Sequence, residues 1–373
     1  MLVLEIVFWC SLGLLVYTHV GYPLALWLLS RVRRTRPLPE RGATALPKVT
    51  LVVAAYDEEA AIEQKVRNAL ALDYPGELFE LIVASDGSED RTAELARAAG
   101  AHVVLDLPRA GKAAAQDAAV EEARGEIVAF SDANSLWAQD ALERLVAPLA
   151  DPTVGYVCGQ VRFSADAGAP NQEGAYWRYE MGVRALESRL GGITAGNGAI
   201  YALRRMHYKA GDPYTGDLSL PFRMARRGLR SVYVASALAE EAMVPSLEGE
   251  FRRKRRMMSR AFGTVLRGGM LNPRGYSGLF AFELASHRLI RYASPFLHLI
   301  ALGTNFALLG HGWIYAVTLV AQGAFLLAAS LGAFVPLRPF RLAYYYLLVT
   351  ASIAAGFWDW VRGGAPLVWE KER

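Results

Sequence analysis

The sequence predicts an α/β domain built on a mostly parallel sheet with crossover helices, flanked at both ends of the chain by transmembrane α-helices. Three observations support this prediction. Hydrophobic residues make up 53% and charged residues only 20% of the 373 residues, and the apolar excess gathers at the two ends. Between about residues 48 and 236, short β-branched runs alternate with stretches of helical periodicity. The length suffices for one large domain and several membrane segments.

Charge and cysteine content exclude several classes of protein. The net charge is +4 and the pI is near 9.0. The basic residues lie mostly beside apolar segments, which is typical of contact with a membrane surface and not with nucleic acid. Cys10 falls in an apolar segment and Cys158 in an expected core strand. We therefore expect neither a disulfide framework nor a zinc site.

The N-terminal segment, residues 1–30, is almost continuously apolar and is expected to form a transmembrane helix. It is longer than the roughly 20 residues that cross the hydrocarbon core. It lacks a small-residue cleavage site and is closed by a basic cluster, so it is predicted to be an anchor and not a signal peptide. That cluster consists of Arg31, Arg33, Arg34 and Arg36. Its charge places this end of the helix in the cytoplasm, where a basic, Pro-rich linker is expected over residues 31–47.

The C-terminal region contains three more apolar runs, and residues 292–362 are predicted to form three transmembrane helices. The runs are Tyr292–Leu309, Trp313–Phe334 and Leu342–Val361. Basic pairs before the first run and between the second and third place those junctions in the cytoplasm, with residues 310–312 outside. Basic and interfacial helices are expected over 251–291, and a tail over 363–373 whose side of the membrane stays open. The protein is thus expected to be a multi-pass inner-membrane protein with a cytoplasmic domain.

The domain between these segments, residues 48–250, shows the alternation of strands and helices in detail. Strands are predicted at Val49–Ala55, Phe79–Ala84, His102–Leu105, Ile127–Phe130 and Val154–Cys158, and helices at Glu59–Leu72, Thr92–Ala99, Lys112–Arg124 and Gln139–Leu149. In sheets of this kind ligands bind beyond the carboxyl ends of the strands. The residues that follow the strands are therefore the first candidates for a functional site.

Polar residues follow each of the first four strands. The segments are Ala55–Glu59, Ser85–Thr92, Arg109–Lys112 and Ser131–Ser135. Asp, Ser and Asn residues often cap helices, and one such cluster alone would need no other explanation. Four clusters at the same edge of one sheet indicate a binding site.

The residue types in these clusters suit a sugar diphosphate. The carboxylate of Asp86 is able to accept hydrogen bonds from a uracil N–H or from ribose hydroxyl groups. Lys112 begins a helix and offers a positive charge beside backbone donors for phosphate. Asp132 and Asn134, two residues apart, present two oxygens to a hard divalent cation, with room left for phosphate oxygens. We expect this cation to be Mg²⁺ or Mn²⁺.

The spacing of these residues resembles the membrane-bound family 2 glycosyltransferases with a GT-A nucleotide-sugar-binding domain. That group includes the cellulose, chitin, hyaluronan and poly-N-acetylglucosamine synthases. The most specific element is Asp86-Gly-Ser-x-Asp-x-Thr92, about thirty residues after Ala55-Tyr-x-Glu-Glu59. The Asp-x-Asp metal motif of the family falls on Asp132-Ala-Asn134, with an amide in place of the second acid. The resemblance assigns donor binding to Tyr56, Glu58, Asp86, Lys112 and Asp132, and metal binding to Asp132 and Asn134.

The second half of the domain resembles further motifs of this family. The segment from Thr194 to Arg204 is similar to the one that lines the acceptor site, which implies roles for Asn197 and Gly198. Pro213–Leu220 is similar to the acidic motif whose second acid is the general base, here Asp217, with Gly216 in place of the first acid. The segment Phe251–Met257 stands in the place of a Gln-x-x-Arg-Trp motif. Acceptor or diphosphate binding is accordingly expected of Arg253 and Arg256, although Arg253 replaces the glutamine and Met257 the tryptophan.

The resemblance implies an inverting transfer of a sugar from a nucleotide-sugar donor, UDP-linked, to a lipid-linked or polysaccharide acceptor. Asp217 is expected to open a helix, whose N-terminus would lower the pKa of its carboxyl and keep it ionised. The expected partners are the donor, the acceptor, membrane lipids and other proteins of polysaccharide synthesis, but no nucleic acid.

Two other functions stay open from the sequence. One is a non-catalytic subunit of a polysaccharide synthesis or export complex. The other is a membrane-tethered dinucleotide oxidoreductase, which the sheet pattern alone would fit. Against the latter, the first strand leads into Tyr56-Asp-Glu-Glu59, where a dinucleotide fold needs a glycine-rich turn.

Overall fold

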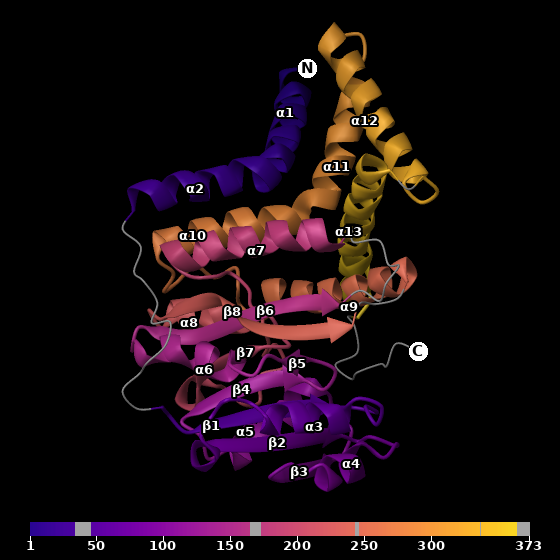
Figure 1. Cartoon of the computed structure of the whole chain (residues 1–373). Helices are drawn as coiled ribbons and strands as arrows, with labels where there is room; N and C mark the ends of the chain where they lie inside the picture. The colour runs from indigo at the N-terminus through magenta and orange to yellow at the C-terminus, as the bar shows by residue number, and fades with distance from the viewer. Residues whose placement is uncertain (34–45, 165–172, 243–245, 336, 364–373) are drawn as a thin grey trace.

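The computed structural model describes residues 1–33, 46–164, 173–242, 246–335 and 337–363. The predicted linker and the predicted C-terminal tail, together with Arg34 and Arg36, lie largely or wholly outside the described residues. Figure 1 shows a sheet domain at one end of the molecule, a layer of helices across it, and a group of helices that projects away from this layer. The site predicted from the sequence lies in the sheet domain.

The sheet has eight strands in the order β3-β2-β1-β4-β7-β6-β8-β5. The strands are β1 (Val49–Ala55), β2 (Phe79–Asp86), β3 (Val103–Leu107), β4 (Ile127–Asp132), β5 (Leu136–Trp137), β6 (Val154–Ser164), β7 (Tyr201–Arg204) and β8 (Arg230–Ala242). Strands β1 to β4 run parallel to one another. Strand β7 is antiparallel to both of its neighbours, β4 and β6. The predicted fold class is confirmed, with the parallel pairing concentrated in the first half.

The domain helices cover both faces of this sheet. They are α3 (Ile62–Leu70), α4 (Thr92–Ala98), α5 (Lys112–Glu122), α6 (Ala141–Val146), α7 (Glu173–Leu190) and α8 (Ser219–Arg226). Every residue of β1 is buried, because Leu51 and Val53 pack in one core and Val52 and Ala54 in the other. A strand covered on both faces is therefore apolar throughout, which is why it was recognisable in the sequence.

The predicted strands and helices of the domain are all present, with boundaries that differ by a few residues. The largest difference is in β6, which continues past Cys158 to Ser164. The pairing register of β6 with β8 shifts between Cys158 and Gln160, at Gly159. A bulge of this kind bends a strand without ending it, so β6 continues through Gly159 beyond its predicted end at Cys158.

A layer of helices separates the sheet from the projecting part. Helix α10 (Gly278–Leu284) continues through the π-helical segment η5 (Ala285–Leu289) into α11 (Ile290–Ala307). Helix α2 (Tyr22–Val32) packs across α7 and α10 through Tyr22, Leu26 and Leu190 (Figure 1). This layer therefore brings the N-terminal and C-terminal segments together over the domain.

Three helices are long and apolar enough to cross a membrane, by length and composition, within the described part of the chain. They are Leu2–Val32, Trp313–Leu331 (α12) and Arg338–Val361 (α13). The first contains α1 (Leu2–Val16) and α2, joined by a π-helical segment at Tyr17–Gly21 where Figure 1 shows a bend. Helix α11, at the place of the first predicted C-terminal span, is not among them because its polar residues lower its hydropathy.

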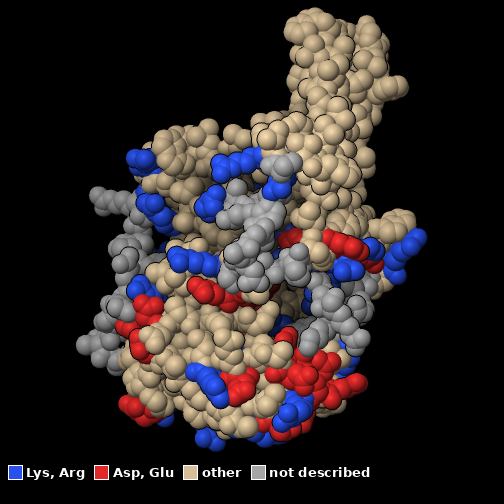
Figure 2. Space-filling view, turned by 45° about the vertical axis from the view of Figure 1, so that its right-hand side comes forward, with Lys and Arg blue, Asp and Glu red and all other residues tan. Residues whose placement is uncertain are grey.

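The distribution of charge agrees with association with a membrane. In Figure 2 the projecting part is almost entirely free of charged side chains, and Lys and Arg residues gather around its base. Helix α9 (Leu247–Leu266), which carries the predicted basic motif, packs against α13 at this level. Basic side chains at the border of an apolar segment are typical of the cytoplasmic membrane surface.

Candidate functional site

The loops after β1 and β2 are joined to each other by backbone–side-chain hydrogen bonds. Asp57 has a positive φ of 50°, and its carboxylate accepts a hydrogen bond from the Glu89 amide at 2.8 Å. The amide of Glu58 donates to the Thr92 hydroxyl at 2.8 Å. The polar residues at these two strand ends thus form one rigid edge, as the parallel pairing of β1 and β2 requires. Tyr56 is a predicted donor-binding residue at this edge. The guanidinium group of Arg109 lies over its ring, 4.0 Å from the ring centroid.

Asp86 holds the loop that follows β3. Its carboxylate accepts hydrogen bonds from the amides of Ala110 and Gly111 at 2.7 and 2.9 Å, and the side chain is 1% exposed. The next residue, Gly87, has a φ of +66°, and a Cβ there would lie 2.7 Å from the backbone nitrogen of Arg109. The structure therefore gives Asp86 a role in shaping the loop ahead of Lys112. Its predicted contact with a nucleoside stays a prediction.

Lys112 and Asp132 meet at the end of the parallel half of the sheet. Lys112 is the first residue of α5, as predicted, and its ammonium group pairs with the Asp132 carboxylate. Both side chains are partly exposed, at 24% and 31%. This pair places a cation and an anion side by side where the diphosphate of a donor is expected.

The chemistry of the predicted metal motif fits a hard cation with few protein ligands. Asp132 is half-buried and Asn134 is exposed. No group of three or more His, Cys, Asp or Glu residues suited to a metal exists among the described residues. Mg²⁺ and Mn²⁺ commonly take one or two side-chain oxygens and complete their shell with substrate phosphates and water. Asp132 and Asn134 offer that arrangement.

Two charged residues that sequence reasoning missed lie beside the metal motif. The Lys65 ammonium group is fully buried and donates to the Ser135 carbonyl at 2.6 Å, and burial lowers its pKa to about 7. Glu241 follows the residues of β8 that pair with β5, so the register places it near Ser135. Burial raises the pKa of Glu241 to about 7, and the negative charge of Asp132 is the next largest contribution to this rise. The metal motif therefore has one buried ammonium group and one half-buried carboxyl group beside it.

Asp217 lies between the sheet and the helix layer. A Cβ added at Gly198 would lie 4.0 Å from its carboxylate, and the Gly196 amide donates to its carbonyl at 2.8 Å. The predicted acceptor segment and the predicted base are therefore adjacent. The charges that act on Asp217 are those of Lys112, Arg184, Arg288 and Asp132.

The expected helix-end effect on Asp217 is wrong. Helix α8 begins at Ser219 with Leu218 as its N-cap, so Asp217 precedes the helix and does not cap it. Withdrawal from solvent raises the pKa of Asp217, although Lys112, Arg184 and Arg288 oppose the rise. A carboxylate with a raised pKa is a stronger base than an ordinary aspartate, so the correction favours proton transfer.

Asn197 is occupied by neighbouring groups of the protein. Its amide oxygen accepts from the Arg184 guanidinium at 2.5 Å, and its amide nitrogen donates to the Gly159 carbonyl at 2.5 Å. The side chain is 5% exposed. Asn197 therefore fixes the segment that presents Gly198 to Asp217, and its predicted contact with an acceptor stays a prediction.

The predicted basic residues of α9 differ in their surroundings. Arg253 pairs with Glu250 at 3.0 Å and lies over the Phe163 ring at 5.8 Å. Its charge also acts on Glu241, which connects it with the Asp132 end of the site. Arg256, one turn further along α9, is half-buried. Burial lowers the pKa of Arg260, and the positive charge of Arg256 contributes to this lowering. The predicted contact of Arg253 and Arg256 with a diphosphate or an acceptor stays a prediction.

A buried ionic network, also missed from the sequence, joins α2, α7 and η5. Glu187 is 0% exposed and accepts from the Tyr22 hydroxyl and from His287, both at 2.6 Å. The second nitrogen of His287 lies 3.3 Å from Glu180, and Glu180 pairs with Arg291. The spacing of Glu180, Arg184 and Glu187 by four and three residues, one face of a helix, is the sequence signal that would have found it.

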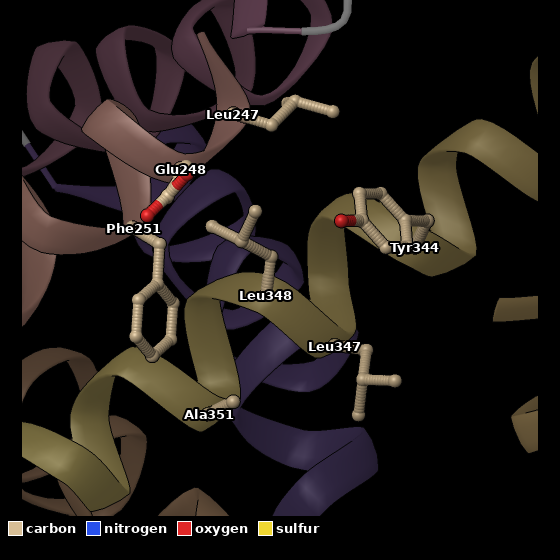
Figure 3. A pocket seen from close by; sticks show the side chains of 7 residues that line it. All are labelled: Leu247, Glu248, Phe251, Tyr344, Leu347, Leu348 and Ala351. Atoms are coloured by element: carbon tan, nitrogen blue, oxygen red, sulfur yellow. The ribbon is translucent and has the colours of Figure 1, made fainter. Parts of the chain in front are cut away.

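An open apolar pocket lies apart from these charges, between α9 and α13. Its cavity volume is about 310 Å³ (Figure 3). The lining residues are Leu247, Glu248 and Phe251 of α9 and Tyr344, Leu347, Leu348 and Ala351 of α13. Its walls are hydrocarbon apart from two polar groups, so it offers no group for sugar chemistry.

Comparison with known proteins gives a family and several relatives. Residues 47–259 match the model of the family described as glycosyltransferase like family 2. The chain is 28% identical over 268 residues to an N-acetylglucosaminyltransferase of Rhizobium meliloti, covering 65% of this chain and 62% of the relative. It is 32% identical over 241 residues to a beta-monoglucosyldiacylglycerol synthase of Trichormus variabilis, covering 59% of this chain and 50% of the relative. The chain thus spans about half to three fifths of the length of these relatives.

A solved structure shares the fold over nearly the whole chain. The mannosyltransferase PcManGT from Pyrobaculum calidifontis, in complex with GDP-Man and Mn²⁺, superposes with a TM-score of 0.72 at 24% identity. The match covers 96% of this chain and 99% of that one. The arrangement of sheet, helix layer and projecting helices is therefore a recurring fold.

Proposed function

Because the chain belongs to glycosyltransferase-like family 2, we propose that it is an inverting glycosyltransferase that moves a sugar from a nucleotide-sugar donor, UDP-linked, to a lipid-linked or polysaccharide acceptor. The observation that carries the proposal is the position of Asp217. It lies within the electrostatic reach of Lys112 and Asp132 on the donor side and next to Gly198 on the expected acceptor side. A base between a diphosphate site and an acceptor segment suits direct transfer.

The transfer is a single displacement at the anomeric carbon. The acceptor oxygen forms the new bond as the bond to the nucleoside diphosphate breaks, and Asp217 takes the hydroxyl proton. General base catalysis of this kind contributes about 10²–10⁴-fold in rate. Lys112 neutralises charge on the departing diphosphate, and Arg253 assists from α9. A divalent cation, held by Asp132 and Asn134, would supply further charge neutralisation when bound.

The acceptor and the location follow from the membrane-associated helices. The curated relatives are named for the synthesis of a glycolipid and for N-acetylglucosamine transfer, which supports a lipid-linked or polysaccharide acceptor. We place the domain on the cytoplasmic face, because basic residues flank the predicted inner junctions. A cysteine introduced at position 311 should react with an impermeant maleimide added to intact cells, whereas one at position 91 should not. The reverse pattern would overturn the orientation.

The activity is tested with the full chain purified in detergent. UDP- and GDP-linked sugars are supplied with Mn²⁺, and release of the nucleoside diphosphate is measured with and without an extract of membrane lipids. Release from one donor above the rate of an Asp217→Asn preparation supports the proposal. Binding of a nucleotide sugar without any release, across all donors and extracts, would favour a non-catalytic subunit.

A further inference from the structure

Two arginines whose charges act on Asp217 are withdrawn wholly or partly from solvent. The charge of Arg288 also acts on the buried carboxylate of Glu187. Arg184 on α7 is 6% exposed, and Arg288 in η5 is half-buried. The guanidinium of Arg184 donates to the amide oxygen of Asn197, and that of Arg288 donates to the Thr194 hydroxyl at 3.0 Å. Neither arginine forms an ion pair with a carboxylate of the described residues, although Arg291 one turn further on pairs with Glu180.

Both guanidinium groups also keep a buried N–H group that has no acceptor among the described residues. These are Nε of Arg184 and Nη2 of Arg288. A buried donor without an acceptor is costly, and more so when it carries charge. Natural proteins pair their buried charges or use them to bind a ligand. Two such cations near the carboxylate of Asp217 favour the binding of an anion.

The position of the two arginines defines which substrate would supply the anion. The donor diphosphate is expected at Lys112 and Asp132, at the carboxyl ends of the parallel strands. Arg184 and Arg288 instead belong to the helix layer, and η5 continues directly into α11 and the projecting helices (Figure 1). The positive charges of both arginines act on the carboxylate of Asp217, the proposed base. An anion held there would therefore reach the site from the membrane side, on the acceptor.

We propose that Arg184 and Arg288 form a phosphate-binding subsite for the acceptor, so that the acceptor is a membrane lipid with a phosphate close to the hydroxyl or oxygen that receives the sugar. That the lipid is the acceptor rests on the proposed function. That it carries a phosphate rests on the two arginines themselves. Thr194 and Asn197 hold the two guanidinium groups in place, and Asp217 lies within their field. The subsite thus couples recognition of a lipid phosphate to the position of the base.

The test measures binding and needs no turnover. The full chain in detergent is saturated with Mn²⁺ and a nucleoside diphosphate, and titrated by calorimetry with dihexanoyl phosphatidic acid, with dihexanoylglycerol and with inorganic phosphate. We expect the phosphatidic acid to bind at least about tenfold more tightly than dihexanoylglycerol. Equal binding of the two lipids would overturn the proposal. Inorganic phosphate that binds as tightly as the phosphatidic acid would overturn the lipid as the source of the phosphate.

Variants connect this binding to the two residues. Arg288→Gln and Arg184→Gln should each weaken phosphatidic acid binding by about tenfold or more, and Arg184→Lys, which keeps the charge, by less. Arg189→Gln removes the same charge from an exposed position of α7 and should bind as the wild type does. Unchanged binding in both glutamine variants would overturn the assignment.

Folding and the proposed function are checked separately. Each variant should keep the wild-type melting temperature within a few degrees and bind Mn²⁺ and the nucleoside diphosphate normally. If the wild type binds no nucleoside diphosphate, the proposed function fails. The lipid titration without nucleotide still decides whether the phosphate subsite exists.

Discussion

The two halves of the site are built in different ways. On the donor side, Asp57, Asp86 and Thr92 bond to backbone groups of neighbouring loops that are 24 to 34 residues away in sequence. On the helix-layer side, Glu187 bonds to Tyr22 and His287, 165 and 100 residues away. The first half is a set of short motifs on parallel strands. The second is assembled only when the two ends of the chain meet over α7.

The halves also differ in burial. The Lys112 and Asp132 side chains remain 24% and 31% exposed, so water and a diphosphate have access to them. Glu187 and His287 are 0% exposed. Charges in the open half are available for binding, whereas the Glu187 and His287 side chains of the buried half fix geometry. Each of the following changes tests that distinction, from the largest expected effect to the smallest.

The largest effect is expected in the buried network. Glu187→Ala leaves the Tyr22 hydroxyl, the Thr194 amide and His287 without their acceptor. Breaking a buried pair costs about 3–5 kcal/mol, so the free energy of unfolding in detergent should fall by about that amount. Glu121→Ala, at an exposed position of α5, should change it by less than about 0.5 kcal/mol. A similar small change in both variants would show that the network does not hold the layer in place.

The next effect concerns the junction of the two halves. Asp217→Asn keeps the shape of the side chain but removes the base, and turnover should fall at least about 100-fold. Asp212→Asn, which removes the carboxylate that pairs with Arg223, should leave turnover close to wild type, because that group is committed to the ion pair. Normal turnover of the Asp217 variant, with loss in the Asp212 variant, would transfer the role of base to Asp212.

The same variant has a predicted pH signature in stability. Because the folded-state pKa of Asp217 is raised, the folded protein binds this proton more readily than the unfolded chain does. Protonation of Asp217 therefore stabilises the folded state. This stabilisation is fully present below about pH 4, the ordinary pKa of an aspartate, and is lost as the pH rises through the folded-state pKa. Asp217→Asn should therefore melt at a higher temperature than wild type at pH 7, with a smaller difference at pH 4. A lower melting temperature at pH 7 would contradict the raised pKa.

A smaller effect is expected in the loops of the donor half. Gly87→Ala forces a side chain into positive φ and brings its Cβ to 2.7 Å from the Arg109 nitrogen. Backbone strain of this type costs about 1–3 kcal/mol, and affinity for the nucleoside diphosphate should fall with it. Gly76→Ala, whose Cβ would meet no atom within 4 Å, is the matched control. Unaltered stability and affinity in the Gly87 variant would show that the loops after β2 and β3 adapt easily.

The smallest effect concerns the metal motif. Asn134→Asp restores the second acid and should tighten Mn²⁺ binding about tenfold, or about 1.4 kcal/mol, as measured by calorimetry. Asp132→Asn should weaken it, and excess EDTA should abolish turnover. Full activity in EDTA would remove the metal from the mechanism, and an unchanged Mn²⁺ affinity in the Asn134 variant would remove Asn134 from the ligands.

The sequence alone determined the fold class and the open half of the site. Parallel strands must be apolar along their length because they are covered on both faces, and their carboxyl ends must share one edge. The residues after β1 to β4 were therefore predicted to lie at one edge of the sheet, as the parallel pairing places them, and their role in binding stays a prediction. The apolar segments at the ends of the chain were equally plain, because a membrane requires long uninterrupted runs.

Only the tertiary structure decided the rest. The environment of Asp217 depends on α7, η5 and the segment before α8. Withdrawal from solvent raises the pKa of Asp217, where the sequence predicted a lowered value. In the sequence, four residues of the helix layer resemble ordinary charged helix residues, because their covering by α2 and α10 is a tertiary feature. They are Arg184, Glu187, His287 and Arg288. Burial by segments far apart in sequence turns such charges into a network or a binding site, because the cost of removing charge from water depends on every neighbour that folding brings near.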